Sequence, residues 1–143
     1  MIRSLREAAA RGVRVRLLVD DVYTSGEDDV LLAMTGLPTV EVRLFNPFPG
    51  GRGAWLTRFM ASAWEFHRVD RRMHNKLFVA DNAAAIAGGR NMADPYVMNA
   101  AGRNFIGMDV FAVGPVVRDF SSAFDLYWNS EMVFPVQSIG RRA

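Results

Sequence analysis

An α/β fold is predicted for this chain of 143 residues, because helix and strand signals alternate along it. Half of the residues are hydrophobic and 22% are charged, a balance typical of a packed globular protein. The length suits one domain. The chain contains no cysteine, which excludes disulfides, thiolate metal sites and a cysteine nucleophile.

The first predicted elements are a helix and a buried strand. Ile2 to Arg11 carries apolar residues at helical spacing, and Gly12 follows in the position where helices often end. Val13 to Val19 alternates Val and Arg before it becomes continuously apolar, a pattern expected of a parallel strand that is covered on both faces. Asp20 and Asp21 end this strand.

A second helix and a second strand follow. Ser25 and Asp28 resemble a capping box that opens a short helix through Met34. Gly36 closes this helix before Thr39 to Phe45, which is predicted to be the next strand. These segments form the strand, helix, strand unit that is typical of α/β proteins.

The middle of the chain is both basic and aromatic. A loop is predicted over Asn46 to Gly53 and a helix over Ala54 to Phe66. Six arginines between positions 43 and 72 are interleaved with Phe45, Phe48, Trp55, Phe59, Trp64 and Phe66. Such a mixture suits the surface of an anionic membrane, and it also suits nucleic acid. Alternatively, the aromatic residues of the helix pack it onto the core.

The second half of the chain predicts two short strands joined by a turn, a third strand and a helix. These elements span, in order, Lys76 to Ala80, Ala84 to Ala87, Phe105 to Val113 and Pro115 to Ser130. Asp81 and Asn82 form a pair that is typical of turns, so the first two strands are predicted to be a hairpin.

Six residues between positions 74 and 91 follow the single pattern HxKxxxxDxxxxxxGGxN. They are His74, Lys76, Asp81, Gly88, Gly89 and Asn91. Six specified positions coincide by chance at far fewer than roughly one in a million starting points, so this pattern is much more specific than a short glycine motif. Lys76 is also the only lysine among the 17 basic residues. Its survival where all the others are arginine favours a specific role for its compact charge.

The pattern and its flanking segments resemble the phospholipase D superfamily, whose signature is the HKD motif, and in particular the first half of bacterial cardiolipin synthases. The flanking similarity covers residues 11–21, 42–48, 71–76 and 109–117. The resemblance implies a half-domain built as a three-layer αβα sandwich with a mixed sheet. Relatives begin such a half with a strand and a complete helix, whereas Met1 falls inside that helix. We therefore expect the first strand to be missing, and residues 1–143 to be an N-terminally truncated single domain with one HKD motif.

The residue types of the motif suit chemistry on a phosphodiester. His74 and Lys76 are two residues apart, so both side chains project from one face of an extended strand. A neutral imidazole can attack phosphorus and form a phosphohistidine, while the ammonium neutralises the non-bridging oxygens. Asn91 and the backbone N–H groups of Gly88 and Gly89 are candidate donors to the charge that grows in the transition state.

The resemblance assigns two further site residues. It implies that Asp109, in the downstream strand, holds the second nitrogen of the nucleophilic imidazole. Asp81 is expected to be more structural, pairing with a basic neighbour or fixing the turn. No metal and no cofactor is expected, because the displacement needs neither.

Simpler readings compete with each assignment. A single histidine such as His74 is usually structural, and only the joint spacing argues otherwise. His67 lies outside the motif and is expected at the surface. The pair Gly88 and Gly89, taken alone, would indicate a turn that needs positive φ. Three acids at positions 27–29 suggest a favourable interaction with a helix dipole rather than a metal site.

The resemblance implies an enzyme, a phosphatidyltransferase similar to cardiolipin synthase that acts on glycerophospholipid phosphodiesters through a phosphohistidine. Active sites of the superfamily use two HKD motifs, whereas this chain has one, so a homodimer partner or a missing C-terminal half is expected to supply the second. The alternatives are a homodimeric phosphodiesterase acting on nucleic acid, and an inactive fragment of a two-motif enzyme. The expected substrate is a phospholipid at a membrane surface, and the expected location is bacterial and peripheral to the cytoplasmic membrane.

Overall fold

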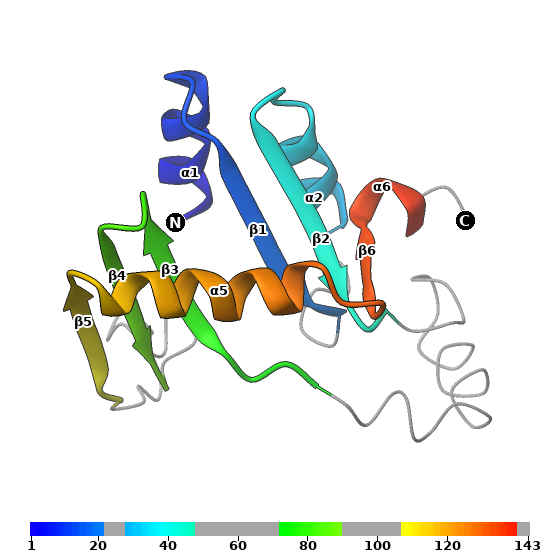
Figure 1. Cartoon of the computed structure of the whole chain (residues 1–143). Helices are drawn as coiled ribbons and strands as arrows, with labels where there is room; N and C mark the ends of the chain where they lie inside the picture. Colours follow the sequence, from blue (N-terminus) through cyan, green and yellow to red (C-terminus); the bar gives the residue numbers. More distant parts are fainter. Residues whose placement is uncertain (22–27, 48–71, 90–106, 140–143) are drawn as a thin grey trace. The chain divides into compact units, whose positions relative to one another are not determined.

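The computed structural model describes residues 1–21, 28–47, 72–89 and 107–139, and in them it shows both helices and strands (Figure 1). The chain divides into two compact units, one made of Met1–Met73 and Trp128–Ala143 and the other of His74–Tyr127. The predicted α/β class is confirmed. The three-layer sandwich, the missing first strand and the single truncated domain stay predictions.

The first unit is built around a mixed sheet with the strand order β1-β2-β6. Its elements are α1 (Ile2–Ala10), β1 (Val15–Asp20), α2 (Asp28–Thr35), β2 (Val40–Phe45), β6 (Val133–Pro135) and α6 (Val136–Ile139). β1 and β2 are parallel, with Val15 opposite Val40, and β6 is antiparallel to β2. The strand, helix, strand unit predicted from the sequence is therefore confirmed.

Helix α1 ends as its sequence predicts. Gly12 adopts a φ of 89°, a conformation that L-residues with a Cβ rarely take. Its N–H donates to the carbonyl of Ala9 at 2.9 Å, and the N–H of Val13 donates to the carbonyl of Ala8 at 3.2 Å. This pair of bonds is the Schellman motif, which satisfies the last carbonyls of the helix and turns the chain into β1.

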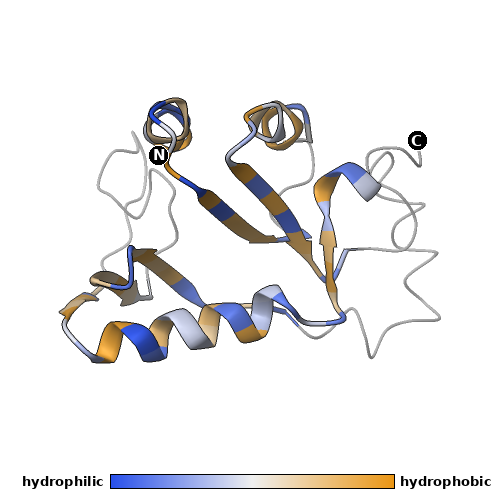
Figure 2. Ribbon diagram, turned by 45° about the horizontal axis from the view of Figure 1, so that its top comes forward, coloured by the Kyte–Doolittle hydropathy of each residue, from blue (hydrophilic) through white to orange (hydrophobic). Residues whose placement is uncertain are grey.

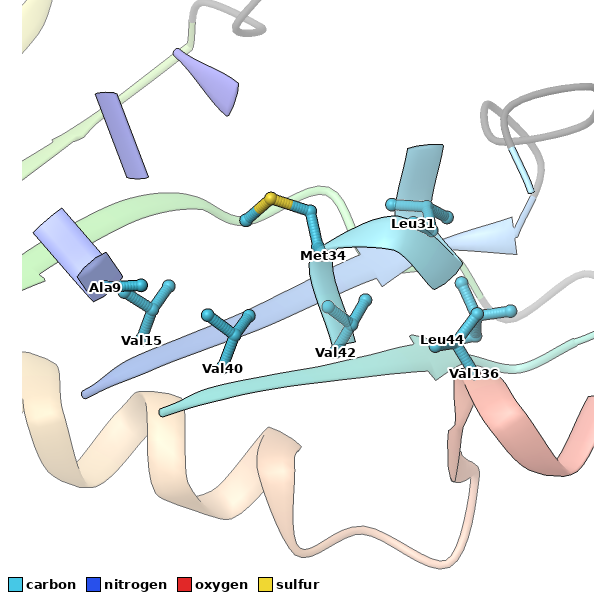
Figure 3. Packing of buried hydrophobic residues seen from close by; sticks show 8 residues of the cluster. All are labelled: Ala9, Val15, Leu31, Met34, Val40, Val42, Leu44 and Val136. Atoms are coloured by element: carbon cyan, nitrogen blue, oxygen red, sulfur yellow. The ribbon is translucent and has the colours of Figure 1, made fainter. Parts of the chain in front are cut away.

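Buried side chains from three helices and two strands form the core of the first unit. Hydrophobic and hydrophilic residues alternate along most of β2, and α1 and α2 lie on one side of β1 and β2 (Figure 2). The cluster consists of Ala9, Val15, Leu31, Met34, Val40, Val42, Leu44 and Val136 (Figure 3). α2 is held on the sheet by Leu31 and Met34, which lie over β2.

The other face of β1 and β2 carries arginines that hold a tryptophan. The guanidinium of Arg43 lies 4.3 Å from the ring centroid of Trp128, and that of Arg16 lies 5.5 Å away. Arg43 also donates to the carbonyl oxygen of Trp128 at 3.0 Å. Trp128 is buried. This packing explains two arginines in a strand pair that would otherwise be expected to be apolar on both faces.

The second unit contains an antiparallel sheet with the strand order β3-β4-β5. Its elements are β3 (Lys76–Ala80), β4 (Ala84–Gly88), β5 (Asp109–Val113) and α5 (Val116–Trp128), whose last residue belongs to the first unit. The predicted hairpin is confirmed: Asp81 and Asn82 have φ values of 53° and 54°, and the N–H of Ala83 donates to the carbonyl of Ala80 at 2.9 Å. Two successive positive φ values define a type I′ turn, which Asp and Asn accept readily.

Some predictions fall outside the described residues or differ from the structure. The capping role of Ser25, the aromatic helix of residues 54–66 and His67 lie outside them. β5 begins at Asp109, with Gly107 and Met108 outside any strand, rather than at the predicted Phe105. The sequence reading also missed β6 and α6, which are only three and four residues long. Elements this short carry too little periodicity to be seen.

Candidate active site

The side chain of Lys76 forms a hydrogen bond with the main chain of His74. Residues 72–75 have no regular secondary structure, so His74 lies two residues before β3 and is not on the strand that begins at Lys76. The Nζ of Lys76 donates to the carbonyl oxygen of His74 at 2.7 Å. An ammonium has three N–H groups, so this bond fixes the position of the charge and leaves further donors for a ligand. The His74 side chain is exposed.

Lys76, Gly88 and Asp109 lie in one row across the sheet of the second unit. Lys76 is opposite Gly88 in the β3–β4 pair, and Gly88 is opposite Asp109 in the β4–β5 pair. Residues directly opposite each other project from the same face of a sheet. Lys76 and Asp109 therefore project from the same face. Their backbones lie about 10 Å apart across the sheet, which is two strand spacings. Only a glycine lies between them.

The carboxylate of Asp109 leans over Gly88. A Cβ built on Gly88 would lie 2.8 Å from the Cγ and 2.8 Å from the Cα of Asp109, closer than real Cβ contacts come. The reading that Gly88 needs a positive φ is therefore wrong: it is a strand residue, and its missing side chain makes room for a carboxylate. A Cβ on Gly89 would meet nothing within 4 Å, and its N–H is directed at the carbonyl of Met108 at 3.5 Å.

The structure does not bring Asp81 to this row. Asp81 follows the far end of β3, five residues from Lys76, which corresponds to about 16 Å along a strand. Its left-handed conformation in the turn accords with the expectation that it is structural. Asn91 lies outside the described residues. Among the described candidates, the structure thus brings Lys76, Gly88 and Asp109 into one row, and His74 contacts Lys76 through its carbonyl oxygen.

The next row on the same face is apolar. Phe78 is opposite Ile86, and Ile86 is opposite Phe111. All three side chains are exposed, Phe111 with 69% of its surface accessible. Alternation along a strand places Phe78 on the same face as Lys76, and Phe111 on the same face as Asp109. One face of the sheet therefore carries a charged row beside an exposed apolar row.

Two residues that sequence reasoning missed hold the chain directly before the motif. The carboxylate of Asp20, at the end of β1, accepts the N–H of Met73 at 2.9 Å and a guanidinium N–H of Arg72 at 3.3 Å. Arg72 also donates to the carbonyl of Asn46 at 3.1 Å. Both missed residues lie in segments that carry the family resemblance, and this was the available signal.

Elsewhere among the described residues, one carboxylate has a shifted pKa. The hydrogen bond from Arg14 to Glu41, at 2.8 Å, lowers the pKa of Glu41 below its usual value. No group of three or more histidine or acidic residues in the described part of the chain could hold a metal ion. In the same ranges, no helix has the length and apolar character needed to cross a bilayer.

Comparison with known families identifies the class of protein that this motif and fold define. Residues 1–128 match the family described as the phospholipase D-like domain of cardiolipin synthase. The chain belongs to this family, which is one of enzymes, and the resemblance inferred from the HKD motif is confirmed.

Individual relatives narrow the comparison. The chain is 43% identical over 139 residues to cardiolipin synthase C of Escherichia coli (strain K12). The aligned region covers 97% of this chain and 28% of that protein. It is 35% identical over 135 residues to an uncharacterized protein of Helicobacter pylori (strain ATCC 700392 / 26695), covering 94% and 26%. It is 28% identical over 134 residues to cardiolipin synthase A of Yersinia pestis bv. Antiqua (strain Angola), covering 90% and 25%. The chain thus spans about a quarter of the length of the curated relatives it matches.

Proposed function

We propose that this chain is the nucleophile-bearing half of a phosphatidyltransferase of the phospholipase D type, similar to cardiolipin synthase. The observation that carries the proposal is the row of Lys76, Gly88 and Asp109 in register across one sheet, with His74 bonded through its carbonyl to the Lys76 ammonium. The row puts a cation and a carboxylate on one face at one end of a small sheet, and the proposed nucleophile lies two residues before β3.

In the proposed reaction, His74 attacks the phosphorus of a phospholipid. The new N–P bond forms as the P–O bond to the leaving alcohol breaks, and a general acid donates a proton to that alcohol. The hydroxyl of an acceptor lipid then attacks the phosphohistidine and gives its proton to the same group, which is now a base, while the N–P bond breaks and the free imidazole is restored. Lys76 holds the non-bridging oxygens with its remaining N–H groups, and Asp109 orients the imidazole. Asn91 and the amide of Gly88 are proposed as neutral donors to the same phosphoryl group. The Gly89 amide, expected from the sequence to be a third donor, is directed at the Met108 carbonyl instead.

The neighbouring apolar row supports a lipid as substrate. Phe78, Ile86 and Phe111 lie on the face that carries Lys76 and Asp109. A phosphodiester bound at the charged row would have apolar surface beside it for its acyl chains, an arrangement that suits a phospholipid better than a nucleic acid. On this proposal the protein works at the surface of a bacterial cytoplasmic membrane as a peripheral protein.

A second HKD motif completes the proposed site. The sequence contains one such motif, so the general acid comes from another polypeptide segment: a second copy of this chain or the other half of a longer enzyme. In the proposed arrangement, two such halves face each other across the site.

Trapping of the phosphoenzyme tests the function. The chain is incubated with vesicles of phosphatidylglycerol that carries a labelled phosphate and, separately, with labelled single-stranded DNA, and the protein is quenched and analysed for covalent label. We expect a phosphatidyl adduct on His74 that is absent from His74→Ala and present in Asn75→Ala, a change of the adjacent exposed residue. Label from DNA but not from lipid would support the nuclease alternative, and label that persists in His74→Ala would refute the assignment of the nucleophile.

A further inference from the structure

A buried carboxylate outside the HKD motif holds the residue that precedes the candidate nucleophile. Asp20 is the last residue of β1, and 7% of its side-chain surface is accessible. Its Oδ2 accepts the backbone N–H of Met73 at 2.9 Å, and its Oδ1 accepts an N–H of Arg72 at 3.3 Å. A hydrogen bond to a carboxylate is stronger than a neutral one, so the 2.9 Å bond holds the Met73 N–H firmly, whereas the 3.3 Å contact with Arg72 is longer and weaker.

The same arginine connects the ends of two parallel strands. Nη1 of Arg72 also donates to the carbonyl of Asn46 at 3.1 Å, directly after β2. Asn46 is buried with a φ of 48°, and its N–H donates to the carbonyl of Met132 at 2.7 Å. Residues 72 and 73 are thus tied to the carboxyl ends of β1 and β2, where ligands of parallel sheets commonly bind.

The main chain at and directly before His74 consequently takes part in two hydrogen bonds with side chains. The Met73 N–H on one side is held by Asp20, and the carbonyl of His74 on the other side is held by the Lys76 ammonium. The residue before His74 is therefore held by a hydrogen bond to a group outside the HKD motif. A nucleophile that attacks phosphorus in line gains rate from such restriction, because a displacement of about 1 Å can cost about a hundredfold.

We propose that Asp20 is a positioning residue for the phosphoryl-transfer site, whose carboxylate fixes the Met73 peptide and thereby the backbone from which the His74 imidazole projects. The catalytic part of this inference rests on the proposed function. The competing explanation is that Asp20 and Arg72 form a buried ion pair that only stabilises the first unit.

Nuclear magnetic resonance of the full chain tests the positioning without requiring turnover. Asp20→Ala removes both acceptors, whereas Asp20→Asn keeps one carbonyl oxygen for the Met73 N–H and loses the charge. Glu41→Gln is the matched control, because it removes a carboxylate that is also bonded to an arginine but is 43% accessible. The measurements are hydrogen exchange at the Met73 amide and the imidazole resonances of His74, with the β2 amides of Val42 and Leu44 as internal references.

We expect exchange at Met73 to accelerate at least about tenfold in Asp20→Ala, and the His74 resonances to shift, while the β2 amides keep their exchange rates. Asp20→Asn should lie between Asp20→Ala and the wild type, and Glu41→Gln should match the wild type. Unchanged His74 resonances in both Asp20 variants would overturn the proposal. So would acceleration at Met73 that is no larger than at Val42 and Leu44, because that result is global destabilisation. If Asp20→Ala does not fold, Asp20→Asn decides by the same criteria.

A second measurement tests whether the position of the His74 backbone affects the rate of adduct formation. In the trapping assay, Asp20→Asn should slow formation of the phosphatidyl adduct by about tenfold to a hundredfold. The vesicle concentration that gives half the maximal rate should stay the same. A change in that concentration with an unchanged maximal rate would contradict a positioning role. Absence of any adduct in the wild type would refute the proposed function while the resonance data still decide whether Asp20 positions His74.

Discussion

Single residues of this site are selected for the space they leave as much as for the groups they supply. Gly88 lies between Lys76 and Asp109, and any side chain there would occupy the place of the Asp109 carboxylate. The second motif glycine, Gly89, has open space around the position of a Cβ. A glycine is therefore required at position 88 by the close approach of Asp109, whereas the space around Gly89 imposes no such requirement.

Substitution of Gly88 should show this difference. Gly88→Ala forces the backbone or side chain of Asp109 to move, and overpacking of this kind costs about 1–3 kcal/mol of unfolding free energy. Gly89→Ala should change the unfolding free energy by less than about 0.5 kcal/mol. Urea denaturation of both variants measures the difference, and equal losses would contradict the close approach of Asp109 to Gly88.

The lone lysine should be essential for chemistry and dispensable for folding. Lys76→Ala removes the charge that is proposed to face the phosphoryl oxygens, and loss of one such stabilising group lowers rates by about a hundredfold or more. Its melting temperature should stay within a few degrees of the wild type, because the side chain is only partly buried.

Arg3→Ala, which removes an exposed cation paired with Glu7 on α1, is the control for charge. It should leave the rate of adduct formation unchanged. Retention of most adduct formation in Lys76→Ala would refute its phosphate-binding role.

At the scale of elements, turns determine which strands meet. The β3–β4 hairpin depends on two consecutive left-handed residues, and its register aligns Lys76 with Gly88. A slip of one residue would move Lys76 to the other face of the sheet. The motif aspartate, Asp81, is one of the two left-handed residues, so its place in the pattern has a structural reason.

Variants of Asp81 can separate turn geometry from charge. Asp81→Asn keeps a residue that tolerates positive φ and should alter the unfolding free energy by less than about 0.5 kcal/mol. Asp81→Val places a β-branched residue there and should cost about 1–2 kcal/mol. Chemical denaturation distinguishes the two. Equal destabilisation by both variants would indicate that the carboxylate charge is what matters.

At the scale of the whole molecule, the chain spans about a quarter of the length of its curated relatives and carries one HKD motif. The proposed mechanism needs a general acid that a single copy of the motif does not supply while its histidine is the nucleophile. Turnover by this chain alone therefore requires association of two copies.

Dilution and mixing should reveal this association. The specific activity of the isolated chain in lipid transfer should fall on dilution, in parallel with dissociation of a dimer measured by sedimentation. An excess of His74→Ala should suppress wild-type turnover, because mixed dimers have one histidine where two are needed. An excess of Glu41→Gln should not suppress it. Turnover by a strict monomer would contradict the shared site.

Much of the fold could be predicted because its signals are local. The end of α1 at Gly12, the hairpin turn at Asp81 and Asn82, and the parallel pair β1 and β2 each follow from short stretches of sequence. The start of β5 and the existence of β6 could not be predicted in the same way. β6 is three residues long and ends in Pro135, so only its pairing with β2 makes it a strand.

The sequence by itself determined the family, the HKD motif and the candidates His74 and Lys76, because their types and spacing are unlike chance, and the family resemblance added Asp109. Only the tertiary structure shows that Asp109 leaves no room for a side chain at Gly88, and that the carboxylate of Asp20 bonds to the residue before His74. Asp20 and Met73 are 53 residues apart along the chain, and they meet only because the chain returns to the end of β1. Contacts of this kind arise from the order and register of strands, which the spacing of residues in a motif does not encode.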